Sequence, residues 1–119
     1  MIQIQVVPRI GVDAYQLLRS KVIHEATTWY WGNKRKTRLR HLQSAGHIDV
    51  ANAGGVLVAR VTPKEPRDIF YLAEKFMGRM VAWFEKDLAG IHLQFLDEPA
   101  SAGRKRAARG RPVKKGSRR

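Results

Sequence analysis

The distribution of large apolar side chains limits where this chain can fold. Residues 99–119 contain only one such side chain, Val113, together with nine Lys or Arg residues and no acidic residue. A segment of this kind cannot bury enough apolar surface to offset the chain entropy lost on folding. We therefore expect one globular domain over residues 1–98 and a disordered basic tail over residues 99–119.

The balance of charge indicates a polyanionic partner. Lys and Arg total 23 against 10 Asp and Glu, so the formal net charge is +13. Of this charge, +4 falls on residues 1–98 (14 basic and 10 acidic side chains) and +9 on residues 99–119. A positive field attracts phosphate groups and releases their counterions. Nucleic acid is the expected partner, although anionic membrane lipid and ribosomal RNA satisfy the same electrostatic argument.

Composition also excludes several classes of site and location. The chain has no cysteine, which rules out disulfides, thiolate metal ligands and cysteine nucleophiles and suits a reducing compartment. No apolar run approaches the ~20 residues that span a bilayer, and the first residues lack the basic and apolar regions of a signal peptide. We expect a protein with no membrane partner, located in the cytoplasm (on the nucleoid if bacterial) or in the nucleus.

The spacing of apolar residues predicts strands and helices. Alternation with a period of two is typical of half-buried strands, and recurrence every three or four residues is typical of amphipathic helices. Asn52-Ala53-Gly54-Gly55 predicts a hairpin turn, because Asn and Gly tolerate positive φ. Pro8 ends the first strand, Gly32-Asn33 caps the first helix, and Gly90 ends the second helix. The predicted strands are residues 2–7, 47–50, 56–61 and 91–95, and the predicted helices are residues 11–31 and, after Pro63 and Pro66, up to about Leu88.

The order β-α-β-β-α-β predicts an α+β fold of the ferredoxin-like, split βαβ type. Two helices would then cover one face of an antiparallel sheet and leave the other face open. An alternative is another α+β sandwich, in which residues 33–45 form a third helix.

The open face of such a sheet bears on function, because RNA-recognition domains place aromatic residues on the central strands. The first strand offers only Gln3 and Gln5 to this face, which argues against base stacking on the sheet. The third strand offers aliphatic residues in either register, so we expect a second subunit to cover the open face in a possible homodimer. The two registers are Val56, Val58 and Arg60, or Leu57, Ala59 and Val61.

A basic cluster follows the first predicted helix, in a loop or a helix extension. Five of the seven positions from residue 34 to residue 40 are basic, and the aromatic run Trp29-Tyr30-Trp31 precedes them. Bases stack on rings while cations meet phosphates, so the cluster is a candidate phosphate-binding site, while Trp29 is expected in the core. The candidate residues are Lys34, Arg35, Lys36, Arg38 and Arg40.

A second candidate site lies in the tail, at Arg109-Gly110-Arg111-Pro112. Gly110 lets the backbone approach the floor of a narrow groove, and Pro112 keeps the chain extended. Arg109 and Arg111 can then point in opposite directions along the minor groove of A·T-rich DNA, where the negative potential is enhanced.

These four residues and their basic flanks resemble the AT-hook, a short DNA-binding motif, over about ten residues. The resemblance implies that the outer basic side chains contact phosphate. Val113 departs from the pattern, because a basic residue is more typical at that position. The implied phosphate contacts are Arg104, Lys105, Arg106, Lys114 and Lys115.

Nothing in the sequence has the spacing of a catalytic or metal site. His47 and Asp49 point the same way on a predicted strand, but a metal-dependent nuclease needs several converging carboxylates or histidines. There is no Gly-rich phosphate loop and no nucleophile elbow. The apolar stripe of the second helix is interpreted as core, so we expect no enzyme, no metal and no cofactor. That stripe is Phe76, Met80, Trp83 and Phe84.

These observations favour a non-enzymatic, architectural or regulatory DNA-binding protein. The tail would enter AT-rich minor grooves while the basic cluster contacts phosphates, and DNA is favoured over RNA. One alternative is an RNA- or ribosome-associated basic protein. Another is an oligomeric assembly or adaptor subunit whose basic tail docks an acidic partner.

Overall fold

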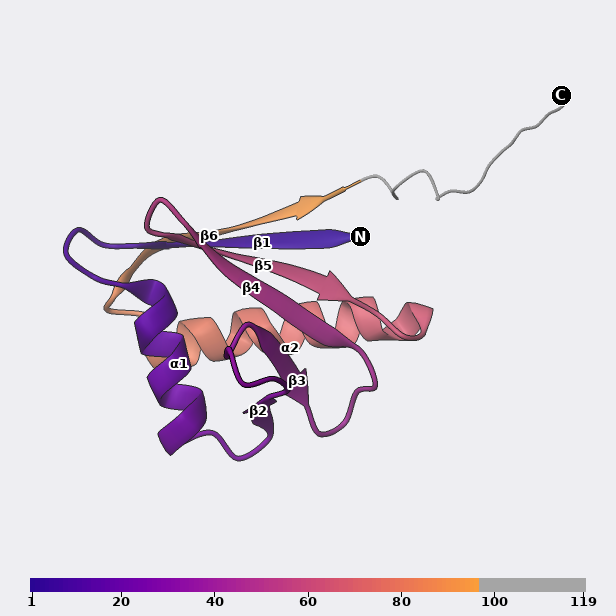
Figure 1. The fold of residues 1–119 in the computed structure, drawn as a ribbon. Helices are drawn as coiled ribbons and strands as arrows, with labels where there is room; N and C mark the ends of the chain where they lie inside the picture. The colour runs from indigo at the N-terminus through magenta and orange to yellow at the C-terminus, as the bar shows by residue number, and fades with distance from the viewer. Residues whose placement is uncertain (97–119) are drawn as a thin grey trace, which may run out of the picture.

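A six-stranded antiparallel sheet and two helices make up residues 1–96, the part of the chain that the computed structural model describes (Figure 1). Across the sheet the strands lie in the order β2-β3-β4-β5-β1-β6. The α+β class is confirmed, whereas the predicted tail lies outside the described residues. The elements are β1 (Ile2–Pro8), α1 (Ala14–His24), β2 (Trp29–Trp31), β3 (Arg38–His41), β4 (His47–Ala53), β5 (Val56–Thr62), α2 (Pro66–Phe84) and β6 (Leu88–Phe95).

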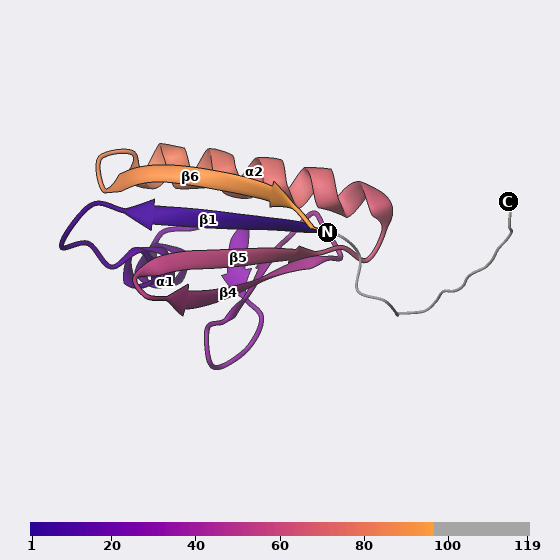
Figure 2. The ribbon, with the colours of Figure 1, turned by 90° about the horizontal axis from the view of Figure 1, so that it is seen from above.

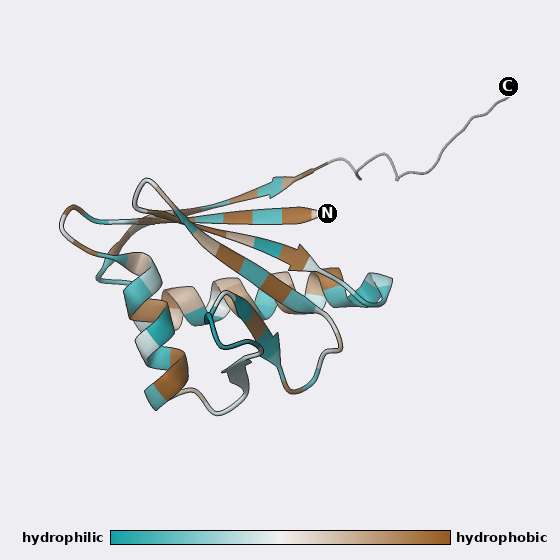
Figure 3. Ribbon diagram, viewed as in Figure 1, coloured by the Kyte–Doolittle hydropathy of each residue, from teal (hydrophilic) through white to brown (hydrophobic). Residues whose placement is uncertain are grey.

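The inner strand β1 shows which face of the sheet is buried. It pairs with β5 and β6, so that Ile4 stands opposite both Ala59 and Leu93. Ile4 and Ala59 are fully buried, whereas Gln3 and Gln5 on the other face are partly exposed. Both helices lie on the buried face (Figures 1 and 2), and the alternation of apolar and polar residues is visible along the strands in Figure 3.

Two strands are additional to the predicted four, so the ferredoxin-like order is not confirmed. β2 and β3 form an antiparallel hairpin in which Trp29 stands opposite His41 and Trp31 opposite Leu39. β3 also pairs with β4. The hairpin therefore extends the sheet beyond β4, on the side away from β6.

The first helix is shorter than the predicted residues 11–31. It begins after Asp13, whose carboxylate accepts a hydrogen bond from the backbone N–H of Gln16 at 3.1 Å, and it ends at His24. Thr27 and Thr28 follow, and their branched Cβ atoms disfavour helix, while the three aromatic residues after them favour strand. The chain therefore leaves the helix before Trp29.

The alternative third helix over residues 33–45 is wrong as well. Along β3 the side chains alternate, with Leu39 and His41 buried and Arg38 and Arg40 more exposed. A strand places every second residue on one face, whereas a helix would separate Leu39 from His41. The extended conformation is favoured because it buries both of them against the core.

The second helix supplies much of the core, and its predicted apolar stripe is confirmed for Phe76, Met80 and Phe84, whereas Trp83 is only half-buried. Phe76 and Met80 are fully buried, and Trp29 packs edge-on against Phe76 with ring centroids 6.4 Å apart. The helix ends at Phe84 rather than at Leu88, and Gly90 does not end it. The backbone N–H of Asp87 donates to the carbonyl oxygen of Phe84 at 2.8 Å, which turns the chain back so that Leu88 begins β6.

The predicted hairpin turn between β4 and β5 is confirmed. Gly54 and Gly55 have φ angles of 61° and 92°, which glycine adopts without steric cost. The side chain of Asn52 accepts a hydrogen bond from the backbone N–H of Gly55 at 3.0 Å. The local sequence is therefore sufficient to form this turn.

Candidate nucleic-acid interface

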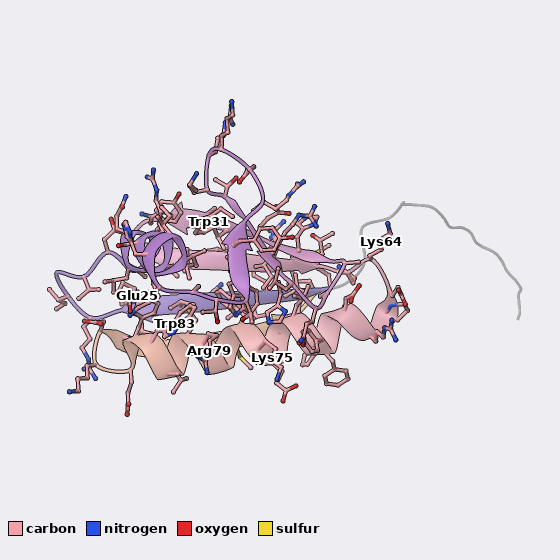
Figure 4. The ribbon with its side chains drawn as sticks, turned by 90° about the horizontal axis from the view of Figure 1, so that it is seen from below. Glu25, Trp31, Lys64, Lys75, Arg79 and Trp83 are labelled. Atoms are coloured by element: carbon pink, nitrogen blue, oxygen red, sulfur yellow. The ribbon has the colours of Figure 1, made fainter. Side chains whose placement is uncertain are left out.

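The basic cluster predicted from the sequence lies on the β2–β3 hairpin. Its first three cations are in the connecting loop, residues 32–37, which we call the hairpin tip. The tip projects from the body of the protein on the side away from α2 (Figures 2 and 4). The structure thus brings the five predicted phosphate-binding residues onto one projecting hairpin: Lys34, Arg35 and Lys36 at the tip, and Arg38 and Arg40 on β3.

Side-chain hydrogen bonds hold the backbone of the hairpin tip. The Oδ1 atom of Asn33 accepts from the backbone N–H groups of Thr37 and Arg38, at 3.0 and 3.1 Å. Its Nδ2 atom donates to the hydroxyl of Thr37 at 2.8 Å. From α1, the hydroxyl of Tyr15 donates to the carbonyl oxygen of Lys36 at 2.9 Å. The cations of the tip are therefore presented by a fixed loop.

The aromatic residues before the tip have different roles. Trp29 is buried, as predicted, and the indole N–H of Trp31 donates to the carbonyl oxygen of Arg19 at 3.4 Å. Tyr30 stands opposite Arg40 in the hairpin, so both project toward the open face of the sheet. Tyr30 is 44 % exposed. No aromatic residue was predicted for this face, because residue 30 was expected to lie in a helix.

The cations of the hairpin differ in how far they are neutralised. Arg38 Nε lies 3.2 Å from Asp49 Oδ1, and Asp49 Oδ2 lies 3.2 Å from His47 Nε2. Within residues 1–96, no ion pair neutralises Lys34 or Arg35, and both side chains are exposed. The hairpin tip therefore offers an approaching phosphate two exposed cations that no carboxylate of residues 1–96 neutralises.

Arg40 contributes to a hollow where β4 begins and β5 ends. The hollow has a volume of about 380 Å³, and Arg40, His47 and Lys64 are the basic residues that line it. Burial lowers the pKa of His47 below 6.5, as do Arg38 and Arg40, although Asp49 opposes them. At neutral pH the hollow therefore takes its charge from Arg40 and Lys64, and side chains of these two types commonly contact phosphate groups.

The rest of the open face is mostly polar. Arg60 Nε donates to Gln3 Oε1 at 3.0 Å, and Gln3 Nε2 donates to Gln94 Oε1 at 3.2 Å. Of the two registers considered for β5, Val56 and Val58 face outward and are only partly exposed. The face is thus less aliphatic than expected, and pairing of two copies through it stays a prediction.

A second group of cations lies in a cleft that the sequence analysis missed. Tyr71, Lys75, Arg79 and Trp83 recur every four residues of α2 and line the same cleft, and the last three are labelled in Figure 4. Lys75 Nζ lies 5.6 Å from the ring centroid of Tyr71, and the guanidinium of Arg79 lies 5.6 Å from that of Trp83. The spacing of four residues in the sequence could have predicted this shared helix face. Trp83 was predicted to lie in the core, but it is only half-buried.

The opposite wall of this cleft comes from the hairpin and from the segment that precedes it, Glu25 to Thr28. Trp29 and His41 line it, and its volume is about 320 Å³. His41 is 5 % exposed, and its Nδ1 atom accepts from the backbone N–H of Gln43 at 3.1 Å. Burial, and secondly the charge of Lys75, lower the pKa of His41 below 6.5. The imidazole is therefore neutral at pH 7, and because Nδ1 accepts a hydrogen bond, its single ring hydrogen is on Nε2.

His47 and Asp49 point the same way, as predicted, and the structure brings His47 Nε2 to 3.2 Å from Asp49 Oδ2. In residues 1–96, however, no three His, Asp or Glu side chains gather as metal ligands would. Neither α1 nor α2 has the length and apolarity to cross a bilayer. The tail candidates lie outside the described residues. They are Arg104, Lys105, Arg106, Arg109, Gly110, Arg111, Pro112, Lys114 and Lys115.

Comparison with family models, with curated protein sequences and with solved structures finds no match for this chain. The function is therefore inferred from the geometry and charge of the residues themselves.

Proposed function

We propose that this protein is a non-enzymatic, architectural or regulatory DNA-binding protein, and that the β2–β3 hairpin contacts the phosphates of a duplex. The observation that carries the proposal is the fixed hairpin tip, which presents Lys34 and Arg35 without an ion pair to any carboxylate of residues 1–96. A two-stranded ribbon has dimensions that the major groove admits. The tip would enter or straddle the groove, while Arg40 and Lys64 hold a neighbouring phosphate in the hollow.

The tail has a complementary role in this proposal. Arg109 and Arg111 would enter an AT-rich minor groove, as their resemblance to an AT-hook implies, and the adjoining cations would contact phosphate. Two weak sites on one chain reinforce each other, because the second binds at a high effective concentration. We also infer that the sheet is a ferredoxin-like unit, β1, β4, β5 and β6, to which the basic hairpin has been added.

Fluorescence anisotropy of the full chain with AT-rich duplex, GC-rich duplex and single-stranded RNA tests this proposal. Lys34→Gln with Arg35→Gln should weaken both duplexes alike, since phosphate contacts do not read sequence. Arg109→Ala with Arg111→Ala should remove the preference for AT-rich duplex. Arg9→Gln with Lys86→Gln removes two exposed charges elsewhere and serves as the control. Equal losses in all three double variants would show a diffuse electrostatic effect, and would refute a specific interface.

A second candidate function, binding of single-stranded RNA, is favoured by the α2 cleft. Aromatic rings with adjacent cations suit a stacked base and its phosphate, and the cleft combines Tyr71 and Trp83 with Lys75 and Arg79. Lys75→Gln with Arg79→Gln should then weaken RNA binding and leave duplex binding unchanged. The opposite pattern would exclude this candidate.

A further inference from the structure

The two outer edges of the sheet differ in length and protection. β6 has eight residues and pairs only with β1 among the described strands, whereas β2 at the other edge has three. Residues 88–96 contain no Asp, Glu, Lys, Arg or Pro. Proteins usually protect a long edge strand with charge, proline or a covering segment, because its unpaired backbone groups bind other strands. β6 has none of these residue-level protections.

The outward backbone groups of β6 follow from its pairing with β1. Leu96 N–H donates to the carbonyl oxygen of Met1 at 2.8 Å, and the amino group of Met1 donates to the carbonyl oxygen of Leu96 at 3.3 Å. In an antiparallel ladder, pairs that exchange hydrogen bonds in this way alternate with pairs whose groups point away. With the observed register, the N–H and C=O groups of Ile91, Leu93 and Phe95 point away from β1.

An apolar groove runs beside this edge, between β6 and α2. Its volume is about 930 Å³. Phe70 on α2 is 83 % exposed and Phe95 on β6 is 82 % exposed, and Val81, further along α2, is 52 % exposed. Large apolar side chains clustered in this way indicate a surface that is covered in use. The groove is also lined by Met77, Gly78, Ile91 and Leu93.

We infer that β6 and this groove form the interface with a second copy of the chain. The two β6 strands pair antiparallel about a two-fold axis at Leu93, so that Ile91 meets Phe95 of the second copy. The residues whose backbone groups point outward are the same ones whose side chains face the groove. A single register of strand pairing therefore gives the outward N–H and C=O groups hydrogen-bond partners and also buries the apolar side chains. The surface is thus self-complementary, as a two-fold interface requires.

The apolar area agrees with this assignment. At ~200 Å² for a free phenylalanine, Phe70 and Phe95 together expose on the order of 300 Å² in each copy. Two copies would thus bury on the order of 600 Å² from these residues, about half of the ~1,200 Å² at the lower end of stable interfaces. Val81, Met77 and the paired strands supply additional area.

Other occupants satisfy fewer of these requirements. Residues 97–119 contain one large apolar side chain, Val113, and carry a net charge of +7 (nine basic and two acidic residues), so they cannot fill an apolar groove. A small apolar ligand could fill it but would leave the outward N–H and C=O groups of β6 unpaired. A second copy provides both apolar side chains and backbone partners.

The dimer does not rest on the proposed function, but it has a consequence for it. In a continuous sheet the two basic hairpins lie at opposite ends, up to about 50 Å apart at ~4.8 Å per strand. Leu96 lies close to the two-fold axis in each copy, so both tails would start near the centre of the dimer. Two chains bound together would raise the affinity for a long duplex by avidity.

Analytical ultracentrifugation of the full chain over a concentration series tests the interface. The unmodified chain should sediment as a dimer, and Phe70→Lys with Phe95→Lys should sediment as a monomer with an unchanged circular dichroism spectrum. Ile10→Lys with Ile23→Lys alters two exposed apolar residues outside the groove and should remain a dimer. A monomeric unmodified chain, with or without an apolar ligand in native mass spectra, would overturn the inference, as would a dimer that survives both groove substitutions.

The register can be tested separately, because the chain has no cysteine. Leu93→Cys introduces a single thiol at the proposed axis, and a short bismaleimide should cross-link two copies efficiently. Ile10→Cys, far from the axis, should cross-link only at the rate of random collision. Equal cross-linking of the two variants would refute the pairing of β6 with itself.

Discussion

The hydroxyl of Tyr15 lies 2.9 Å from the carbonyl oxygen of Lys36, and this hydrogen bond joins α1 to the tip of the basic hairpin. Lys36 has a φ angle of +60°, a conformation that few residues other than glycine adopt. The bond from Tyr15 therefore stabilises an unfavourable backbone conformation at the point where the cations are presented.

Tyr15→Phe should loosen the hairpin tip without unfolding the protein. We expect the free energy of unfolding to fall by about 1 kcal/mol, the usual contribution of one such hydrogen bond. Amide hydrogen exchange should accelerate at residues 33–38 more than in β1. Tyr30→Phe is the matched control, because among residues 1–96 no hydrogen bond is made by the hydroxyl of Tyr30. Unchanged exchange at the tip in Tyr15→Phe would contradict the prediction.

Lys34→Gln with Arg35→Gln should reduce the salt dependence of DNA binding. Each phosphate contact that is lost lowers the slope of log K against log salt concentration by about 0.9. A slope reduced by nearly two is expected from titrations of a duplex at several salt concentrations. Arg9→Gln with Lys86→Gln should leave the slope close to that of the unmodified chain. An unaltered slope in the hairpin variant would show that the tip does not contact phosphate.

Asp68→Asn should destabilise the start of α2. Asp68 is buried, and its carboxylate accepts hydrogen bonds from the backbone N–H groups of Glu65 and Lys64, at 2.8 and 3.0 Å, and from the hydroxyl of Ser44 at 2.9 Å. The free energy of unfolding should fall by ~1–3 kcal/mol, as measured by urea denaturation. Glu85→Gln, on an exposed residue just after the helix, should have little effect.

The same carboxylate predicts a dependence on acid. The backbone N–H of Glu65 is the main cause that lowers the pKa of Asp68 below 3.8, and Ser44 and Lys64 add to it. A lowered pKa in the folded state contributes stability that is present above pH 3.8 and is lost as the pH falls through the folded-state pKa. Asp68→Asn should remove this part of the acid denaturation, and an identical acid profile in the variant would contradict the assignment.

His41 should make the protein less stable in mild acid. Burial, and then Lys75, lower the pKa of His41 below 6.5 in the folded state. Because the unfolded chain binds the proton more readily, stability is complete above pH 6.5 and declines as the pH falls toward the folded-state pKa. Thermal unfolding of His41→Phe should depend less on pH in this range. His24→Gln, on the exposed side of α1, is the control and should keep the dependence of the unmodified chain.

Several elements could be predicted from local sequence because local forces determine them. The alternation of Ile2, Ile4 and Val6 predicted β1, and Gly54-Gly55 predicted the turn that the structure contains. The hairpin could not be predicted, because Trp29 continues the helical spacing of Leu18 and Val22. A three-residue strand such as β2 is stable only when its backbone forms hydrogen bonds with a neighbouring strand. That neighbour, β3, is a separate segment, and the local spacing of apolar residues does not reveal that the two segments pair.

The candidate site shows the same division. The position and charge of the basic cluster were evident from the sequence, but its attachment to Tyr15 depends on a contact across 21 residues. The stripe from Tyr71 to Trp83 is readable from its spacing of four, whereas Trp29 and His41, the other wall of that cleft, come from a different element. A cleft whose two walls come from different elements can be predicted only when the packing of those elements is known.

By itself, the sequence determined the α+β class, the apolar face of α2, the β4–β5 turn and the place of the basic cluster. These depend on side-chain periodicity and backbone preference, which act over a few residues. Only the tertiary structure decided that residues 29–41 form a hairpin and that Phe70 and Phe95 share an open groove beside an unprotected edge. Burial and strand pairing are properties of neighbours in space, and residues 25 positions apart become neighbours only when the chain has folded.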